Sequence, residues 1–515
     1  MKPDKSLFLL FKSLSKAEKI YLKKFAGRHS KNGSSVKLLE AIESRASKDD
    51  YDEAEVKDLL RKEIPSGEFP VIKNYLYNNL LNGLTRYYQK SNVSIGLSAL
   101  INSAEVLFQK GHLEQSLKLL KRAREAAIEN ESYIKLLEVI RLENRSVRAS
   151  APLNAVSEKL MNNYEEERSV LDKIENRSTY RRLFDEFVIF LTGEGTSGNK
   201  EQRTALKKYL SGKFLIDESL ALTTHSVILF NLIYLIYLTL FGDPKKALMH
   251  GEKILTLYKE KPGRKIIYGY EYILTLQELS SVQRNLGNDR KAKAYAGEVM
   301  RGIDTILKFY PKRVRNFLLC RTLLTETNVS LLRGDFEKSR ELIEQLLENN
   351  PPNSYRDEKI VTNYAAGIIY YALGKKEKAL YHINYILNSP EINIRTDLQA
   401  SARIINLIIH YELGNLDSIK YFLRSVYHYL KKRRKLSDSE ITILEFIKSM
   451  VRAKTSDEQI YILKKANNDI AVIRSGPPGN RSVNLFFIET WVEGKLSGRS
   501  FAEVIKQRAS GGYYS

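Results

Sequence analysis

The chain has 515 residues, of which 43% are hydrophobic and 28% are charged, as is ordinary for a globular protein. Its single cysteine, Cys320, excludes an intramolecular disulfide framework and a metal site built from several cysteines. Lysine and arginine outnumber aspartate and glutamate by 83 to 61, and the net charge of +22 favours acidic partners such as nucleic acid, anionic lipid or an acidic peptide. Part of that excess is compositional, because Lys, Asn, Ile and Tyr are abundant throughout the chain.

Residues 1–92 are predicted to form an N-terminal helical bundle without repeat spacing. Ser15 and Glu18 have the spacing of a capping box and open the helix KAEKIYLKKFA. Three further helical stretches follow, VKLLEAIESRA, EAEVKDLLRKE and PVIKNYLYNNLLNGLTRYY. The apolar stretch LFLLF near the N-terminus is shorter than the apolar region of a signal peptide, and no small-residue cleavage site follows it. We therefore expect a cytoplasmic protein.

Residues 93–225 are predicted to form helical hairpins of degenerate repeat character. One hairpin is recognisable over 95–145, where Gly111 is followed five residues later by Ser116 in KGHLEQSLKLLKRA. Residues 150–220 are predicted to be helical with an uncertain register.

The segment TGEGTSGNKEQ resembles a phosphate-binding loop in its glycine spacing. Gly193 and Gly198 are five residues apart, and Lys200 follows closely. A P-loop requires lysine directly after the second glycine and then Ser or Thr for magnesium, but Asn199 and Glu201 flank the lysine here. The preceding RRLFDEFVIFL also fits a helix better than a buried strand, so we expect a flexible loop and no nucleotide site.

The most apolar stretch of the chain is SVILFNLIYLIYLTLF, residues 226–241. It is shorter than the ~20 apolar residues that a membrane-spanning helix requires. Polar residues precede it and GDPKKA follows at once. The stretch therefore predicts a fully buried helix and no membrane span.

A glycine followed five residues later by a small residue recurs along residues 226–436. The pairs are Gly242 and Ala247, Gly287 and Ala292, Gly334 and Ser339, Gly374 and Ala379, with Gly414 and Ile419 as a degenerate copy. Successive glycines are 45, 47, 40 and 40 residues apart, a period typical of helical solenoids. Each glycine is predicted to end one helix in the left-handed conformation. The small residue one turn into the next helix then lets the two helices approach closely.

Residues 226–436 resemble tetratricopeptide repeats, most strongly over 360–391. Gly367, Tyr370, Gly374 and Ala379 follow the family's small–aromatic–glycine–alanine series, and Pro351 and Pro390 lie near its repeat-ending proline. The chain departs from the family in its period, which exceeds the usual 34, and in placing Ser280, Thr327 and Leu407 at the first small position. The resemblance implies an all-α fold, a right-handed α-solenoid of helical hairpins.

In that family the first helix of each hairpin lines a binding groove. Carried onto this chain, the resemblance implies groove positions at Gln277, Arg284, Arg321, Asn328, Tyr364, Tyr371 and Tyr411. The asparagine and lysine series that clamps a terminal carboxylate in some relatives is not reproduced, so recognition of a chaperone tail is not implied. Most of the 31 tyrosines are predicted to wedge between stacked helices with their hydroxyl groups at the surface.

The run KKRRK at the end of the array is the densest cluster of charge. It comprises Lys431, Lys432, Arg433, Arg434 and Lys435. Positive charge is favourable at a helix C-terminus, by a few tenths to ~1 kcal/mol. A solvated helix end therefore explains the run, and contact with phosphate or an acidic peptide is the alternative.

Residues 437–515 are predicted to form a C-terminal helical cap and a disordered tail, SGGYYS. SDSEITILEFIKSMV and DEQIYILKKAN have helical patterns, SGPPGNRS breaks the chain, and the last amphipathic helix carries the only tryptophan, Trp491. The final hairpin of an array exposes an apolar face, and we expect this segment to cover it.

The sequence offers no set of residues typical of catalysis. None of the seven histidines forms HExxH or pairs with a cysteine at ligand spacing, and no GxSxG surrounds a serine. Cys320 lies among apolar neighbours in RNFLLCRTLL, which favours a buried small side chain over a reactive thiol. We therefore expect no enzyme activity, no cofactor and no metal.

Two functions are compatible with these sequence features. The first is a cytoplasmic scaffold or adaptor that presents the concave groove of the array to a peptide or protein segment. The alternative is a nucleic-acid-associated regulator, in which the N-terminal bundle or the KKRRK run contacts phosphates.

Overall fold

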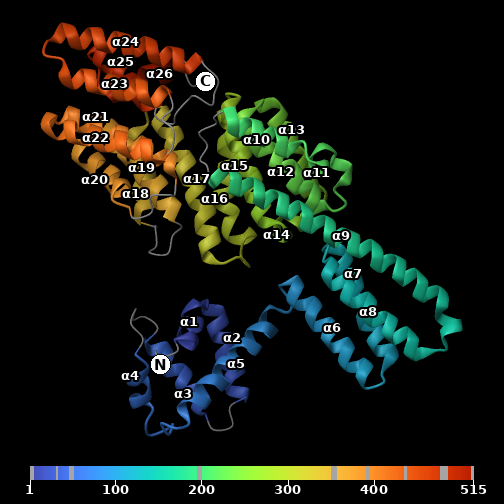
Figure 1. Ribbon diagram of the computed structural model, residues 1–515. Coiled ribbons are helices and arrows are strands. Elements are labelled where there is room, and N and C mark those ends of the chain that lie inside the picture. The colour runs from blue at the N-terminus through green and yellow to red at the C-terminus, as the bar shows by residue number, and fades with distance from the viewer. Residues whose placement is uncertain are drawn as a thin grey trace. The chain divides into compact units, whose positions relative to one another are not determined.

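The computed structural model is helical throughout the part of the chain that it describes (Figure 1). The described residues are 5–29, 33–45, 52–193, 200–348, 356–389, 395–433, 438–475 and 485–511. Within them lie 26 α-helices and one short 3-10 helix, and no strand. The all-α fold class predicted from the sequence is therefore confirmed. The chain divides into two compact units, residues 1–174 and 175–515, which are described separately.

The first half of unit 1 is a bundle with its own apolar core. Its helices are α1 (Ser6–Ser13), α2 (Lys16–His29), α3 (Ser34–Arg45), α4 (Glu53–Leu59) and α5 (Phe69–Tyr88). The core contains Phe11, Leu22, Leu39 and Leu80, all fully buried. The predicted capping box is present: Glu18 N–H donates to Ser15 Oγ over 3.3 Å, and Ser15 N–H donates to Glu18 Oε2 over 2.7 Å.

The second half of unit 1 holds the hairpin predicted over 95–145. Its helices are α6 (Val93–Gln109), α7 (Leu113–Glu129) and α8 (Tyr133–Ser150), followed by the 41-residue α9 (Leu153–Gly193). Ser116 lies on α7 and donates its hydroxyl proton to the Ala104 carbonyl of α6 over 2.8 Å. Arg124 of α7 forms ion pairs with Glu143 of α8 and Glu166 of α9. Charged side chains therefore bind the first part of α9 to α7 and α8.

Unit 2 begins with the rest of α9, then α10 (Lys200–Leu210) and α11 (Lys213–Ile216), and continues with five helical hairpins. The first helix of each hairpin is α12 (Thr224–Phe241), α15 (Gly269–Asn285), α17 (Lys312–Leu332), α19 (Arg356–Ala372) or α21 (Thr396–Glu412). The corresponding second helices are α13 (Pro244–Glu260), α16 (Asp289–Ile306), α18 (Phe336–Glu348), α20 (Lys376–Leu387) and α22 (Leu416–Arg433), and the short α14 (Arg264–Ile267) precedes α15. Each second helix packs on the first helix of the next hairpin, and successive first helices also contact one another.

The turn glycines end the helices as the spacing predicts. Gly287, Gly334, Gly374 and Gly414 have φ between +73° and +75°. In each case the N–H group of the following residue donates to a carbonyl five residues before it, as in Lys375 N–H to Tyr370 O over 2.8 Å. This hydrogen bond is that of the Schellman motif. The motif requires a residue in the left-handed backbone conformation, which only glycine adopts without strain. Gly242 differs, since it ends α12 with φ −126°.

The close approach between the two helices of a hairpin is most direct at Gly367. A Cβ atom on this residue, in the middle of α19, would lie 2.6 Å from Cδ1 and 2.8 Å from Cγ1 of Ile383 on α20. Ala379, one turn earlier on α20, is fully buried. The small residues of the repeat therefore lie where the two helices touch.

We expect Gly367→Ala to lower the free energy of unfolding by ~1–3 kcal/mol, because the added methyl overlaps Ile383. Urea denaturation followed by Trp491 fluorescence measures the change. Gly297→Ala on α16 is the matched control, since its Cβ would meet only the flexible end of Arg301, 3.0 Å away. The control should be neutral or stabilising by ~0.5–1 kcal/mol.

The steric origin of this effect is testable by a second substitution. Ile383→Val removes Cδ1, so the double variant should be more stable than the sum of the two single changes predicts. Strictly additive effects would show that Gly367 matters for a reason other than its contact with Ile383.

The C-terminal helices pack against the array at more places than its end. They are α23 (Asp438–Arg452), α24 (Ser456–Ser475), α25 (Leu485–Ser497) and α26 (Phe501–Ser510). α23 contacts the last hairpin, as a cap does, but α26 packs on α17 and α19. Phe487, Ile488, Trp491 and Ile505 are buried in one apolar core with residues of α17 to α22. The C-terminal helices thus pack along α17 and α19 as well as against the last hairpin.

Helix α12, the most apolar in the sequence, lies among other helices. It contacts α13 and α15, and its core is shared with Tyr180, Phe187, Leu206 and Leu215 of α9 to α11. Among the described helices it alone has the length and apolar composition to cross a membrane, and 56% of that stretch is buried.

Candidate functional site

Most of the predicted groove positions are engaged with other residues of the chain. Gln277 and Arg284 lie on α15, Arg321 and Asn328 on α17, Tyr364 and Tyr371 on α19, and Tyr411 on α21. The structure brings Gln277, Arg284 and Arg321 together at the contact between α15 and α17, whereas Asn328 is exposed.

Side chains on α15 and α17 form a polar ladder between the helices. Gln277 Nε2 donates to Thr322 Oγ1 and to the Leu318 carbonyl, each over 2.7 Å. Arg284 forms an ion pair with Glu326, and Arg321 forms one with Glu278. Burial lowers the pKa of Arg284, and the charge of Glu326 opposes that shift. The ladder therefore joins consecutive first helices and fixes their separation.

The three tyrosines of the predicted groove lie against neighbouring helices. Tyr364 and Tyr371 are buried, and Tyr411 is half-buried. The ring of Tyr371 lies 4.9 Å from that of Phe487 and 5.2 Å from that of Phe501, centroid to centroid. Tyr411 meets the Trp491 ring edge-on at 5.9 Å. The C-terminal helices of the chain itself thus occupy the space beside Tyr371 and Tyr411.

Helix α17 remains the accessible first helix. Along α12, α15, α19 and α21, no described side chain away from the helix ends is exposed. On α17, Asn328 is exposed and the Arg321 side chain retains 42% of its exposure. Among the described residues, the open part of the first-helix face is therefore the strip of α17 that carries these two residues.

Two other sequence predictions fall partly outside the described residues. Lys431, Lys432 and Arg433 form the end of α22, but their side chains, and all of Arg434 and Lys435, lie outside the part of the chain that the structure describes. The glycine-rich loop at 194–199 also lies outside it. Residues 153–193, directly before that loop, form a continuous helix, as the pattern of RRLFDEFVIFL predicts.

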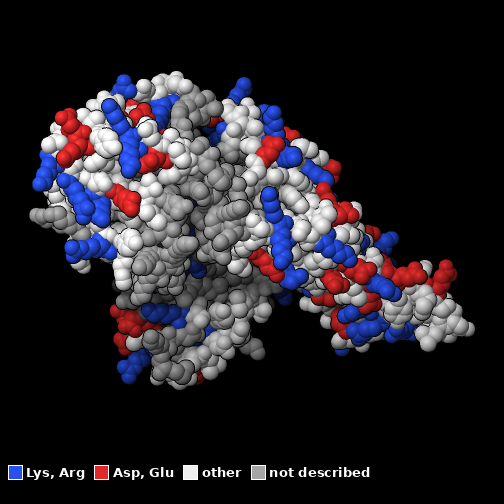
Figure 2. Space-filling view, turned by 45° about the horizontal axis from the view of Figure 1, so that its top comes forward, with Lys and Arg blue, Asp and Glu red and all other residues white. Residues whose placement is uncertain are grey.

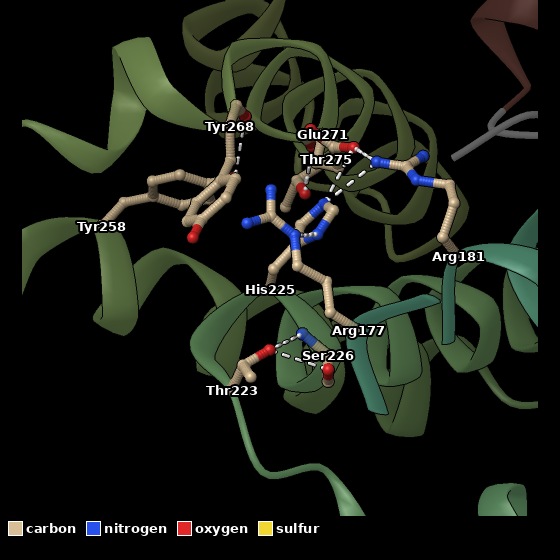
Figure 3. A network of polar contacts seen from close by, with 9 residues as sticks. All are labelled: Arg177, Arg181, Thr223, His225, Ser226, Tyr258, Tyr268, Glu271 and Thr275. Carbon is tan, nitrogen blue, oxygen red and sulfur yellow. Dashed lines mark hydrogen bonds and ion pairs between the residues drawn. The ribbon is translucent and has the colours of Figure 1, made fainter. Parts of the chain in front are cut away.

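A buried cluster of polar side chains in unit 2 was not predicted from the sequence (Figure 3). We call it the His225 cluster, comprising Arg177, Arg181, His225, Tyr268 and Glu271. Both arginines lie one turn apart on α9, and His225 and Glu271 lie in the first turns of α12 and α15. His225 and Glu271 are each only 3% exposed. The cluster therefore places charge inside the apolar core.

Hydrogen bonds define the protonation state of His225. Arg177 Nε donates to His225 Nδ1 over 3.0 Å, so Nδ1 carries no proton. Nε2 then carries the proton and donates to Glu271 Oε1 over 3.2 Å, and Arg181, whose Nη2 lies 3.0 Å from Nε2, pairs with the same carboxylate. The imidazole is thus neutral in this arrangement.

The electrostatics of the cluster agree with that assignment. Burial lowers the pKa of His225, and the charges of Arg177 and Arg181 lower it further, although Glu271 opposes them. Burial alone would raise the pKa of Glu271, but the hydrogen bond from His225 and the charge of Arg181 lower it to about 2. A carboxylate is therefore ionised and an imidazole neutral at the junction of three helices.

Aromatic and capping contacts surround the cluster. The Tyr268 ring stacks on His225 with centroids 4.7 Å apart and planes at 6°. The Arg177 guanidinium lies 5.5 Å from the centroid of the same ring. Thr223 caps α12 by accepting from Ser226 N–H over 3.0 Å. His225 and Glu271 are buried and the Arg181 side chain is 36% exposed, and the physical effect of the cluster is to hold α9, α12 and α15 together.

No local sequence pattern marks this cluster. His225 and Glu271 are 46 residues apart, and Arg181 is 90 residues from Glu271. The available signal was Glu271 in the otherwise apolar stretch GYEYILTL, where an acid needs a partner. Among the described residues no group of three or more His, Cys, Asp or Glu could hold a metal ion.

Comparisons with known proteins found no match to this chain. No protein-family model matches it, and neither a curated protein nor a solved structure matches it.

Proposed function

We propose that the chain is a non-catalytic scaffold, a right-handed solenoid of tetratricopeptide-like hairpins that binds a peptide or protein segment. The observation that carries the proposal is the accessible strip of α17, with exposed Asn328 and half-exposed Arg321, while the other first helices have no described side chain exposed away from their ends. A partner that reaches the first-helix face meets α17.

Preformed geometry supports binding at this strip. The α15–α17 ladder holds the backbone of α17 through Gln277, Arg284 and Arg321, so a partner does not have to order the surface on binding. Rigid sites lose less entropy on association, and this raises affinity without added contact area. The role of the buried polar residues is then to fix the binding surface.

The exposed groups indicate the chemistry of the partner. An asparagine amide both donates to and accepts from an extended peptide backbone, and a guanidinium favours a carboxylate. Arg321 keeps donors free of Glu278 because its side chain is only partly buried. The proposed partner is thus a peptide or protein segment with at least one acidic side chain.

Site-specific photo-crosslinking of the full chain tests this proposal. A benzophenone amino acid replaces Asn328 in one protein and Glu341, exposed on α18, in the control. In native lysate we expect an adduct of defined mass from position 328 and none from position 341. Equal labelling at both positions, or no adduct at 328, would contradict binding on α17.

A further inference from the structure

Four tyrosines are exposed on the outer faces of two consecutive second helices. Tyr381 and Tyr385 on α20 are 70% and 45% exposed, and Tyr421 and Tyr427 on α22 are 71% and 52% exposed. Tyrosine normally buries its ring and leaves the hydroxyl group in water. Exposure of this size leaves ring surface open to solvent, so these residues contribute little to the fold.

Two of the four tyrosines occupy equivalent positions of the repeat. Tyr381 lies seven residues after Gly374, and Tyr421 lies seven residues after Gly414, so both occupy the same position of successive hairpins. The equivalent position on α18 is Glu341, which is exposed and acidic. An exposed tyrosine therefore occupies this repeat position on α20 and on α22, but not on α18.

Basic residues accompany the exposed rings. Lys378 precedes Tyr381 by one turn, and its ammonium group lies 5.5 Å from the Tyr370 ring centroid. Arg424 lies one turn after Tyr421 and is exposed. The same helix continues in sequence into Lys431 and Lys432. On the face shown in Figure 2, Lys and Arg are interspersed with Asp and Glu.

We propose that the exposed tyrosines of α20 and α22 (Tyr381, Tyr385, Tyr421 and Tyr427), which we call the aromatic face, bind single-stranded nucleic acid. Bases stack on the open tyrosine rings while Lys378 and Arg424 contact phosphates. Every base has a flat aromatic surface, so stacking tolerates any sequence, and a basic surface beside it follows the backbone. The net charge of +22 attracts such a polyanion over longer range. The inference is independent of the peptide site on α17.

The composition of the face favours nucleic acid over a protein partner. Among the side chains that the structure describes, the large hydrophobic ones exposed on α20, and on α22 beyond Leu416 at its first residue, are tyrosines. A helix face that docks on another protein generally adds aliphatic anchors at the centre of the contact, as in helix-in-groove binding. Each of the two hairpins instead carries exposed tyrosine rings and a basic side chain, Lys378 on α20 and Arg424 on α22. Such a surface matches the repeating bases and phosphates of a nucleic acid strand.

Fluorescence anisotropy with a labelled oligo(dT) of about 20 nucleotides tests the proposal on the full chain. Tyr381→Ala with Tyr421→Ala should weaken binding roughly 25-fold or more, since each lost stacking contact weakens it at least about 5-fold. The affinity of Tyr381→Phe with Tyr421→Phe for the oligonucleotide should stay within about 2-fold of that of the original chain, because the rings are kept. Lys378→Gln should reduce the slope of log affinity against log salt by about 0.7.

Two controls separate this face from general attraction to polyanions. Tyr461→Ala removes an equally exposed tyrosine, 71% exposed on α24, and should leave affinity unchanged. Labelled polyglutamate should bind more weakly, without dependence on Tyr381 or Tyr421. The proposal is overturned if the oligonucleotide does not bind at low salt, if Tyr461→Ala weakens binding as much, or if polyglutamate shows the same tyrosine dependence. The last result would identify the face as a site for acidic protein.

Discussion

Trp491→Ala is expected to lower the free energy of unfolding by ~3–5 kcal/mol, the range for removing a large aromatic side chain from a core. The Trp491 side chain is 4% exposed and contacts the rings of Tyr411 and Phe446 edge-on, both at 5.9 Å. Its indole N–H also donates to Glu412 Oε1 over 2.9 Å. One residue therefore joins α21, α23 and α25.

The loss comes mainly from apolar packing. Glu412 also accepts from Lys376 and pairs with Lys495, over 3.0 and 2.6 Å, so its charge stays compensated when the indole is removed. These partners keep the pKa of Glu412 low although burial alone would raise it. Trp491→Phe keeps most of the packing and should be less destabilising, losing chiefly a hydrogen bond to a charged group, ~1.5–3 kcal/mol.

Urea denaturation followed by circular dichroism measures these differences, because the Trp491 variants lack the fluorescent reporter. Tyr461→Ala is the control for loss of an aromatic ring at the surface and should change stability by less than ~0.5 kcal/mol. If Trp491→Ala proves as harmless as the control, the C-terminal helices do not share a cooperative core with the array.

The hairpins were predictable because their determinants are local. The hydrogen bonds that end a helix at a glycine join residues within six positions of one another. The small residue that follows packs against the first helix of its own hairpin. The spacing from Gly287 to Gly414 therefore located the turns, and the Ser15–Glu18 capping box located a helix start. Each of these features depends on residues that are adjacent in the chain.

The packing of helices around the hairpins was not predictable, because it depends on distant residues. Tyr371 was a groove candidate from its position in the repeat, yet Phe487 and Phe501 lie beside it, more than one hundred residues further along. Arg181 reaches Glu271 across 90 residues. A single sequence encodes such contacts only as isolated charged or aromatic residues in apolar helices, which do not identify their partners.

Glu271→Ala is expected to destabilise unit 2 by about 3 kcal/mol, since removing one partner of a buried charge cluster leaves the others uncompensated. The effect should lie near the lower end of the usual range, because the Arg181 side chain is 36% exposed and water can solvate it. Glu271→Gln keeps an acceptor for the proton on His225 Nε2 and should be milder, at ~1–2 kcal/mol. Trp491 fluorescence during urea denaturation reports both losses.

The same cluster makes stability depend on pH, with a sign set by each pKa. The pKa of Glu271 is lowered to about 2 in the folded chain, so its contribution is complete above its ordinary pKa of 4.5 and is lost as the pH falls from 4.5 towards 2. The pKa of His225 is also lowered, so the unfolded chain takes up the proton first below pH 6.5. Both groups therefore make acid destabilising, and His225 acts at the higher pH.

His225→Asn isolates the histidine contribution. The asparagine oxygen can still accept from Arg177, but the side chain no longer titrates. Between about pH 6.5 and 4.5, we expect the stability of the original chain to fall by up to ~1.4 kcal/mol per pH unit more than that of the variant, the value for one proton. Equal slopes for the original chain and His225→Asn would mean that His225 is protonated in the folded state. Arg177 could then no longer donate to Nδ1, and the hydrogen bonds that join α9 to α12 would have to be rearranged.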